Sequence, residues 1–319
     1  MKLGDIRNIS VIGAGTMGSG IGLTFALCGY EVTLNDVSEK ILNTAMNHVE
    51  DYLGTFNDNG IVSKDDIEKT ISRIRITTSL EKAAEEADFV TETASEDLEV
   101  KRKLFTDLDA ICPQHTIIAS NTSSLALADF AERCKRRDKI LITHWINPPH
   151  IIPAVEILGS KDTSNETIVL VCKLMEKVDK VPIRVLKELQ GLIINRIQAA
   201  MIREVFSLWE EGVATPVDID KAVKASFGLR LAVTGPLETC DFGGLDIWYT
   251  LSKNLFKIIS DIHKPPERIK MMVERGELGL KSGKGFFDYD TSQNRDTVKA
   301  IKERDTRLIR LSKLLFGKG

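Results

Sequence analysis

An apolar stretch of the chain contains one histidine, His144, and a lone carboxylate, Glu156, follows twelve residues later. Pro148 and Pro149 lie between them and predict a chain reversal that would bring the two side chains together. An imidazole has an unperturbed pKa of about 6.5, so it can accept a proton near neutral pH. A carboxylate on its other ring nitrogen would stabilise the imidazolium that forms. The pair is a candidate catalytic base and partner, and a histidine buried only for packing is the alternative.

A glycine-rich turn near the start of the chain predicts a dinucleotide site. Gly13, Gly15 and Gly18 form the pattern G-x-G-x-x-G between a β-rich run at 8–12 and a helix-compatible stretch. Such glycines allow a tight turn, close approach of the backbone to a pyrophosphate, and close packing of helix on sheet. The second β-rich run ends in Asp36, whose carboxylate can accept hydrogen bonds from ribose hydroxyls and would repel a 2′-phosphate. NAD is therefore favoured over NADP.

The elements around these residues predict an α/β protein built on a doubly wound, Rossmann-like parallel sheet. Apolar runs rich in β-branched residues predict buried strands at 87–93, 115–121 and 139–146. Helical patterns at 96–111 and 167–178 alternate with them. Ligands bind such sheets at the carboxyl ends of the strands, where the segment 120–124 and His144 are both expected.

The second half of the sequence predicts only helices. Apolar residues recur at three- and four-residue spacing from Gly191 to Gly212, and further helices are expected at 215–228, 243–262 and 266–278. Thr215 is the expected N-cap of the second of these helices. We place the boundary near residue 190, giving a nucleotide-binding domain at 1–190 and an all-α domain at 191–319. Its apolar stripes exceed what a small helical domain can bury, which predicts a homodimer.

Composition excludes several other classes of protein. The chain has 319 residues and a net charge of −3, so neither nucleic acid nor an anionic membrane is an expected partner. Its five cysteines are scattered, which argues against a metal site or a disulfide framework and favours a reducing compartment, the cytoplasm. No apolar run is long enough to span a bilayer, and the first residues lead directly into a strand, leaving no room for a signal peptide.

The order of several segments resembles the L-3-hydroxyacyl-CoA dehydrogenase family from about residue 8 to residue 290. The matching segments are GAGTMGSG, EDLEVKRKLF, SNTSSL, HWINPPHIIPAVEI, GLIINRI, EEGVATPVDID, GPLETCDFGGLD and GLKSGKGFFDY. The resemblance implies a Rossmann-like domain followed by a helical domain that dimerises. It also implies that His144 is the base, that Glu156 is its partner, and that Ser123 and Asn195 contact the substrate. Both polar side chains could hold the reacting oxygen.

The resemblance further implies NAD-dependent oxidation of the 3-hydroxyl of a short L-3-hydroxyacyl-CoA, such as 3-hydroxybutyryl-CoA. Residues expected to bind the cofactor are Gly13, Gly15, Thr16, Met17, Gly18, Asp36, Glu96, Lys101, Asn121, Asn147 and Lys281. We favour this acyl-CoA reaction as the prediction from sequence.

Two departures from the family pattern keep an alternative open. In the acyl-CoA enzymes, the helix after the second strand is rich in lysines that meet the CoA phosphates, whereas residues 43–60 here contain no Lys or Arg, and Lys64 lies just beyond. Arg230 precedes a Gly-Pro pair, and the sequence around it resembles that of dehydrogenases of the L-gulonate and L-carnitine type. Its guanidinium could bind a substrate carboxylate bidentately. The alternative substrate is thus a small free 3-hydroxy acid. A non-catalytic relative, such as the structural lens proteins of this fold, is a second alternative that the intact His144 and Glu156 disfavour.

Overall fold

A computed structural model describes residues 1–289 and 297–317 of the chain. The chain divides into two compact units, which we describe separately. The first consists of residues 1–193 together with 305–319, and the second consists of residues 194–304. No helix among the described residues is long and apolar enough to cross a membrane.

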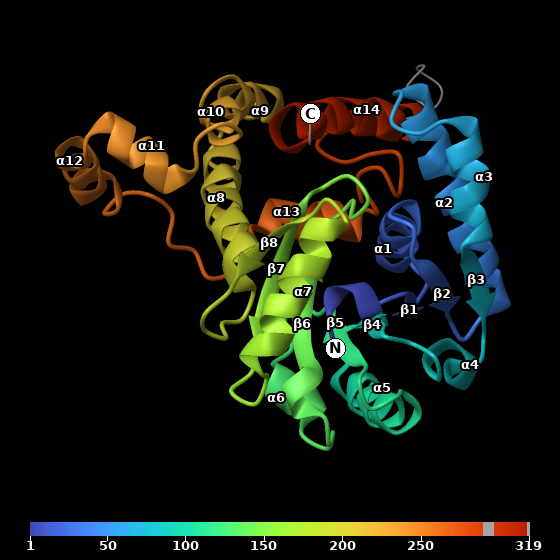
Figure 1. Ribbon diagram of the computed structural model, residues 1–319. Coiled ribbons are helices and arrows are strands. Elements are labelled where there is room, and N and C mark those ends of the chain that lie inside the picture. Colours follow the sequence, from blue (N-terminus) through green and yellow to red (C-terminus); the bar gives the residue numbers. More distant parts are fainter. Residues whose placement is uncertain (290–296, 318–319) are drawn as a thin grey trace. The chain divides into compact units, whose positions relative to one another are not determined.

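The first unit is built on one eight-stranded sheet with the strand order β3-β2-β1-β4-β5-β6-β7-β8 (Figure 1). The strands are β1 (Asn8–Ile12), β2 (Glu31–Asn35), β3 (Ile74–Thr77), β4 (Phe89–Glu92), β5 (Ile117–Ser120), β6 (Ile140–Trp145), β7 (Ala154–Gly159) and β8 (Val181–Arg184). The order reverses at β1, as in doubly wound folds, and the predicted α/β class is confirmed. The sheet is not wholly parallel, because β7 runs antiparallel to β6 after the Pro148–Pro149 turn.

Helices cover both faces of this sheet, so its strands are apolar on both sides. One face packs against α1 (Thr16–Leu27), α2 (Glu39–Asp58) and α7 (Asn165–Lys177). The other packs against α4 (Leu80–Ala84), α5 (Leu98–Ile111) and α6 (Leu127–Ala131). Helix α3 (Lys64–Ser72) lies beside α2, and two short 3-10 turns complete the unit at Leu3–Asp5 and Arg137–Lys139.

Capping side chains set where these helices begin. Asp97 accepts a hydrogen bond from the backbone N–H of Val100 at the start of α5, and Ser164 accepts one from Thr167 at the start of α7. The expected helices at 96–111 and 167–178 are therefore confirmed, each starting slightly away from the predicted residue.

The second unit is helical, as predicted. Its helices are α8 (Leu192–Glu210), which begins in the first unit, α9 (Pro216–Ala225), α10 (Phe227–Leu231), α11 (Pro236–Gly243), α12 (Leu245–Leu255) and α13 (Glu267–Glu274). The hydroxyl of Thr215 accepts a hydrogen bond from the N–H of Asp218, so the predicted N-cap is confirmed. The helix expected at 243–262 is shorter, because α12 ends at Leu255.

The last helix, α14 (Thr297–Phe316), departs from the predicted division of the chain. The sequence assigned everything after residue 190 to the helical domain, but residues 305–319 belong to the sheet unit. The physical reason is burial: Ile309 is only 5% exposed and joins the apolar core under α1 and α2. The amide of Asn59 also donates to the hydroxyl of Thr306 at 3.3 Å.

Candidate active site

The glycine-rich turn joins β1 to α1 with the geometry that a dinucleotide requires. Gly13 has φ of +99°, and a Cβ there would lie 2.7 Å from the backbone carbon of Thr93. A Cβ on Gly18 would collide with the carbonyl oxygen of Gly13, so this position also needs glycine. Gly15 is exposed and a Cβ on it would meet nothing, which leaves space in front of the amino end of α1. That space and the helix dipole suit a pyrophosphate.

Asp36 follows β2 and lies beside this turn. Its Oδ2 accepts a hydrogen bond of 2.9 Å from the backbone N–H of Ala14. One carboxylate oxygen therefore holds the glycine-rich turn, and the half-buried side chain lies where an adenine ribose is expected. Thr16 and Met17 form the first turn of α1 beside it.

His144 and Glu156 form a buried pair. They occupy facing positions on the antiparallel strands β6 and β7, so the side chains project from the same face of the sheet. His144 Nδ1 lies 2.7 Å from Glu156 Oε2, and the two side chains are 8% and 0% exposed. A carboxylate can only accept, so Nδ1 carries the hydrogen and Nε2 keeps the free lone pair. The pairing predicted from the proline turn is thus present.

The second oxygen of Glu156 is also engaged. Oε1 accepts a hydrogen bond of 2.8 Å from the backbone N–H of Ile193, in the first turn of α8. Gly191 and Leu192 have φ of +81° and +49°, so the chain turns sharply to direct this N–H at the carboxylate. The amino end of α8 is therefore a favourable place for a carboxylate.

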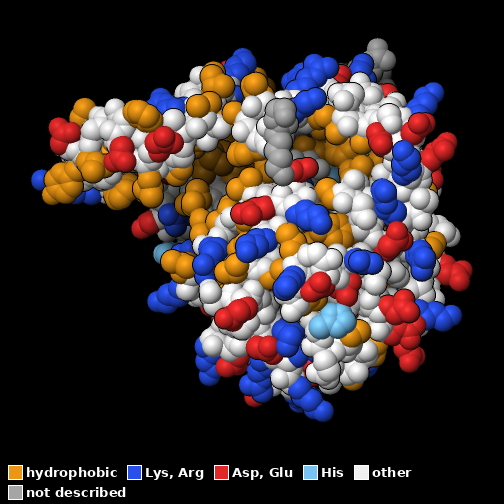
Figure 2. All heavy atoms as spheres, viewed as in Figure 1, with side chains coloured by type: hydrophobic (Ala, Val, Ile, Leu, Met, Phe, Trp, Pro, Cys, Tyr) orange, Lys and Arg blue, Asp and Glu red, His pale blue; other side chains and the backbone are white. Residues whose placement is uncertain are grey.

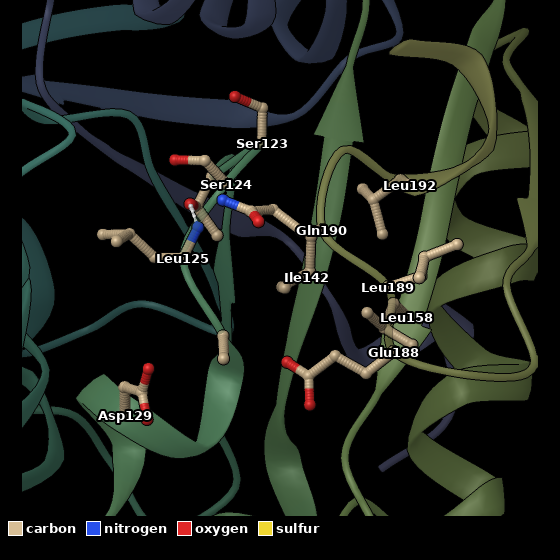
Figure 3. A pocket seen from close by; sticks show the side chains of 12 residues that line it. Ser123, Ser124, Leu125, Asp129, Ile142, Leu158, Glu188, Leu189, Gln190 and Leu192 are labelled. Atoms are coloured by element: carbon tan, nitrogen blue, oxygen red, sulfur yellow. Dashed lines mark hydrogen bonds between the residues drawn. The ribbon is translucent and has the colours of Figure 1, made fainter. Parts of the chain in front are cut away.

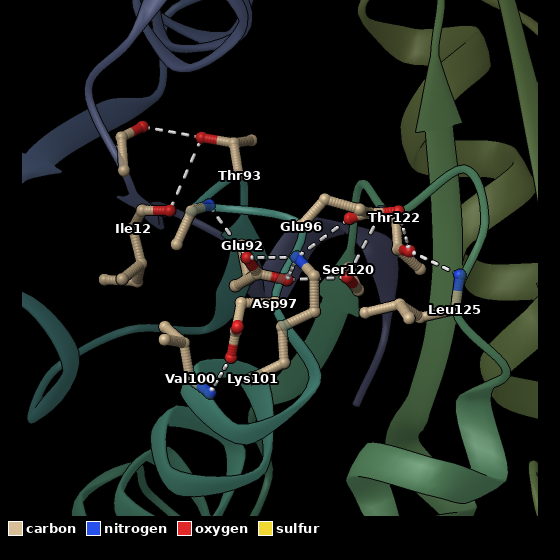
Figure 4. A network of polar contacts seen from close by, with 12 residues as sticks. Ile12, Glu92, Thr93, Glu96, Asp97, Val100, Lys101, Ser120, Thr122 and Leu125 are labelled. Atoms are coloured by element: carbon tan, nitrogen blue, oxygen red, sulfur yellow. Dashed lines mark hydrogen bonds and ion pairs between the residues drawn. The ribbon is translucent and has the colours of Figure 1, made fainter.

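A second buried ion pair lies at the carboxyl ends of β4 and β5 (Figure 4). The ammonium of Lys101 is 2.7 Å and 2.9 Å from the two oxygens of Glu92, and the side chains are 1% and 0% exposed. Glu92 also accepts hydrogen bonds from the backbone N–H of Ala94 and from the hydroxyl of Ser120. Lys101, expected near the cofactor, therefore lies beneath the surface and ties α5 to β4, while the hydroxyl of Ser120 ties β5 to the same carboxylate.

Glu96 organises the loop that follows β5. Its Oε1 accepts from the hydroxyl of Thr122, the N–H of Ser123, and both the N–H and the hydroxyl of Ser124. Burial by itself would raise the pKa of Glu96, but these hydrogen bonds and the charge of Lys101, 3.5 Å away, hold that pKa below its ordinary value. The carboxylate is thus charged, and the backbone of Ser123 is fixed.

A cavity of about 300 Å³ runs between this loop and the segment that leads into α8 (Figure 3). Ser123 and Ser124 line one side, and Leu189 and Leu192 line the other. Ile142 and Leu158 also line the cavity. Each lies two residues along its strand from His144 or Glu156, so strand alternation places all four side chains on the same face of the sheet. Its charged lining groups are the carboxylates of Asp129 and Glu188, so this part of the site supplies no cation.

The other predicted residues fall into two groups. Asn121 accepts from the N–H of Trp145, which joins the ends of β5 and β6, and exposed Asn147 follows β6 directly. Asn195 lies in the first turn of α8, exposed Arg230 lies in α10, and exposed Lys281 lies in the loop after α13. These last three residues belong to the helical unit, and their roles in substrate and cofactor binding stay predictions.

Sequence reasoning missed Glu92 and Ile193. Glu92 carries a signal, because it is an acid at the end of an apolar strand, nine residues before a lysine on the following helix. Ile193 acts through its backbone N–H, so its side chain gave no sign of the hydrogen bond.

Two family profiles match nearly the whole chain. One, described as "3-hydroxyacyl-CoA dehydrogenase, NAD binding domain", matches residues 8–189. The other, described as "3-hydroxyacyl-CoA dehydrogenase, C-terminal domain", matches residues 191–289. Residues after 289 lie outside both profiles.

Individual relatives agree with the profiles. A probable 3-hydroxybutyryl-CoA dehydrogenase of Bacillus subtilis is 36% identical over 287 residues, which cover 90% of this chain and 98% of that protein. The crystal structure of a 5-formyl-3-hydroxy-2-methylpyridine 4-carboxylic acid 5-dehydrogenase, an NAD-dependent dismutase, has a TM-score of 0.88 and 30% identity, and the match covers 98% of this chain and 100% of that one. A 3-hydroxyacyl-CoA dehydrogenase from Archaeoglobus fulgidus has a TM-score of 0.65 and 33% identity with the same coverage.

The glycine-rich turn, the acid after β2 and these matches agree on the cofactor and on the class of protein. The chain is an NAD-dependent oxidoreductase that belongs to the 3-hydroxyacyl-CoA dehydrogenase family.

Proposed function

We propose that this protein oxidises the hydroxyl of a small free 3-hydroxy acid, with His144 as the base and Glu156 as its partner. The buried pair, with Nδ1 and Oε2 at 2.7 Å, supports the chemical part of the proposal. Because Nδ1 donates to Glu156, Nε2 is the atom that takes the hydroxyl proton. Bound NAD would accept the hydride. As the imidazole becomes positive, the ionised Glu156 stabilises it.

Positioning of the substrate and of the cofactor is assigned to neighbouring groups. Ser123 and Asn195 are proposed to hold the reacting oxygen through hydrogen bonds. Ser123 is suited to this role because its backbone N–H is held by a hydrogen bond to Glu96. Gly13, Gly15, Gly18 and Asp36 are proposed to hold the cofactor, and contacts of Asn121, Asn147 and Lys281 with it are part of the same proposal.

The composition of residues 43–60 favours a free acid over a CoA ester. CoA carries several phosphate charges, which need cations at the rim of a site. Residues 43–60, which make up most of α2 and the turn after it, contain no Lys or Arg but do contain Glu50, Asp51 and Asp58. The end of this segment is also covered, because Asn59 donates to Thr306 of α14. The acidic character and partial covering of this segment are the main reason to propose a free acid as the substrate.

A free acid needs a cation for its own carboxylate, and the cavity beside Ser123 has none among its lining residues. Arg230, exposed on α10 of the helical unit, is the proposed donor. Its planar guanidinium can bind a carboxylate through two parallel hydrogen bonds. One relative of this fold is named for a small pyridine carboxylic acid, which agrees with a substrate that bears its own carboxylate.

A short L-3-hydroxyacyl-CoA is the second candidate substrate. It is favoured by the 36% identity to a probable 3-hydroxybutyryl-CoA dehydrogenase, of which the match covers 98%. With this substrate, the phosphate contacts would fall to Lys64 at the start of α3 or to cations elsewhere. The acid-base chemistry of His144 and Glu156 would be the same.

The decisive experiment is a substrate panel combined with Arg230→Met. NADH formation is measured with L-gulonate, L-carnitine and free 3-hydroxybutyrate, and with 3-hydroxybutyryl-CoA. We expect turnover of a free acid that falls by about 3 kcal/mol, or roughly a hundredfold in kcat/KM, in Arg230→Met, because the carboxylate loses its partner. Lys224→Met is the matched control, since Lys224 is another exposed cation of the helical unit.

Rapid turnover of the CoA ester that ignores Arg230→Met would reverse the choice of substrate. In that case Lys64→Ala and added salt should raise KM, because exposed phosphate contacts are screened. Turnover of no member of the panel would leave the family's non-catalytic relatives as the better comparison.

The helical unit is proposed to form a homodimer. Large apolar side chains gather over α11 and α12, where Figure 2 shows many exposed hydrophobic groups. Leu237, Phe242 and Tyr249 are 80%, 77% and 72% exposed. A patch of this kind is a common feature of subunit interfaces. A cytoplasmic location is proposed with it, because none of the five cysteines, all among the described residues, forms a disulfide.

A further inference from the structure

A second cavity of about 480 Å³ lies in the first unit, on the face of the sheet covered by α1 and α2. It is distinct from the cavity beside Ser123, and the two share no lining residue. Its walls come from the ends of α1 and α2, the turn between β6 and β7, the turn before β8, and α14. Its volume lies in the range of small-molecule sites, roughly 300–1,000 Å³.

The walls of this cavity are mainly apolar. Leu27 and Phe56 contribute from α1 and α2, Ile151 from the turn between β6 and β7, and Ile309 and Phe316 from α14. The α14 wall lies beyond residue 289, where both family profiles end. The other walls lie within residues 8–189, which the first profile matches.

One charged group of this cavity is buried. Lys180 is 6% exposed, and its ammonium donates to the carbonyl oxygens of Pro149 and Ile152 at 2.7 Å and 3.1 Å. It also lies 5.5 Å from the centroid of the Trp145 ring. Two carbonyl dipoles and an aromatic ring compensate this charge only in part. Exposed Asp179 and the thiol of Cys28 also act on the ammonium electrostatically.

The remaining ionisable groups of the lining are Cys28, His150, Asp179 and Lys313. Asp179 and Lys313 are exposed. Two cations and one carboxylate thus face the cavity, and the buried charge is positive. An apolar space with a buried, incompletely compensated cation is complementary to an anion that carries an apolar body.

We propose that this cavity binds a small monocarboxylate with an apolar body, and that Lys180 is the counter-charge of its carboxylate. The remaining ammonium hydrogen of Lys180 would donate to the carboxylate, and the apolar body would lie against Phe56, Ile309 and Phe316. Lys180 also holds the turn between β6 and β7, the strands that bear His144 and Glu156, through its hydrogen bonds to that turn. The proposed site therefore lies beside this turn but does not include the catalytic pair.

The test measures octanoate, benzoate and octanol binding to the full chain by calorimetry, first without NADH and then with NADH at saturation. We expect both carboxylates to bind in the presence of NADH, and the neutral alcohol to bind more weakly. Lys180→Met should weaken carboxylate binding at least about tenfold while leaving octanol binding unchanged. Lys173→Met is the matched control, because Lys173 is exposed on α7, just before Lys180, and does not line the cavity.

A second variant tests the cavity independently, in case Lys180→Met does not fold. Ser312→Trp fills the cavity from α14 while keeping the charge, and it should weaken carboxylates and octanol alike. Preference for octanoate over benzoate would identify a flexible alkyl acid, and the reverse preference an aromatic one. Absence of carboxylate binding at millimolar concentration, loss of binding when NADH is added, or equal affinity in wild type and Lys180→Met would each overturn the proposal.

Discussion

Replacing Glu156 by Gln tests the catalytic pair with the least change in shape. In the native arrangement one carboxylate oxygen accepts from His144 Nδ1 at 2.7 Å, and the other accepts from the N–H of Ile193 at 2.8 Å. An amide has one oxygen and one NH₂ group, so it can accept from only one side. Either its NH₂ faces the N–H of Ile193, donor against donor, or it faces His144.

Each arrangement has a defined cost. In the first, a backbone N–H loses its acceptor, which costs about 1–3 kcal/mol. In the second, Nδ1 becomes an acceptor, the hydrogen moves to Nε2, and His144 can no longer take the substrate proton. The imidazolium also loses its counter-charge in both cases. We expect kcat to fall on the order of 10²–10⁴-fold, which corresponds to about 3–5 kcal/mol.

The assay follows NADH formation by absorbance with the best substrate of the panel, together with NAD binding by calorimetry. NAD affinity should stay near the wild-type value, because Glu156 lies on β7 and the glycine-rich turn follows β1. His144→Gln should lower kcat at least as far. Thr143→Val is the matched control: Thr143 is buried next to His144, its side chain points to the other face of β6, and its hydroxyl bonds to none of the described residues.

A Glu156→Gln enzyme within about threefold of wild-type kcat would refute the assignment, because a change below ~1 kcal/mol is too small for the loss of a base and its counter-charge. The same holds for a kcat that falls equally in Thr143→Val, since that would indicate general damage to β6.

Three further outcomes are expected. Asp36→Asn keeps an oxygen for the N–H of Ala14 but removes the charge, so the ratio of kcat/KM for NADP to that for NAD should rise by at least about tenfold, and an unchanged ratio would show that Asp36 does not select the cofactor. Burial lowers the pKa of Lys180 from its ordinary value to about 8, so above pH 8 the unfolded chain holds a proton there that the folded chain has released. The free energy of unfolding of the wild type, relative to Lys180→Met, should therefore rise by up to about 3 kcal/mol between about pH 8 and the unfolded pKa near 10.5, and a flat difference in chemical denaturation would contradict it. Sedimentation should give a particle of about twice 35.5 kDa, with Phe242→Asp shifting it toward the monomer, and a wild-type monomer at micromolar concentration would contradict the proposed dimer.

Local patterns in the sequence determined the cofactor and the chemical pair. The glycine spacing, the acid after the second strand and the alternation of apolar runs each act over a few residues, so they can be read without the fold. The proline turn placed His144 opposite Glu156 because a hairpin pairs residues that are close in the chain. The predicted strands and helices of the first half are correspondingly present.

Only the tertiary structure decided the features that join distant residues. The bond from Ile193 to Glu156 spans 37 positions and uses a backbone N–H, which leaves no mark in side-chain types. The bond from Ser120 to Glu92 spans 28 positions and forms because parallel neighbours bring their carboxyl ends together. The last helix differs from the predicted division for the same reason, because its residues from 305 on group with the sheet unit. An amphipathic helix shows that one face is buried, but the partner surface, here α1 and α2 around Ile309, is set by packing alone.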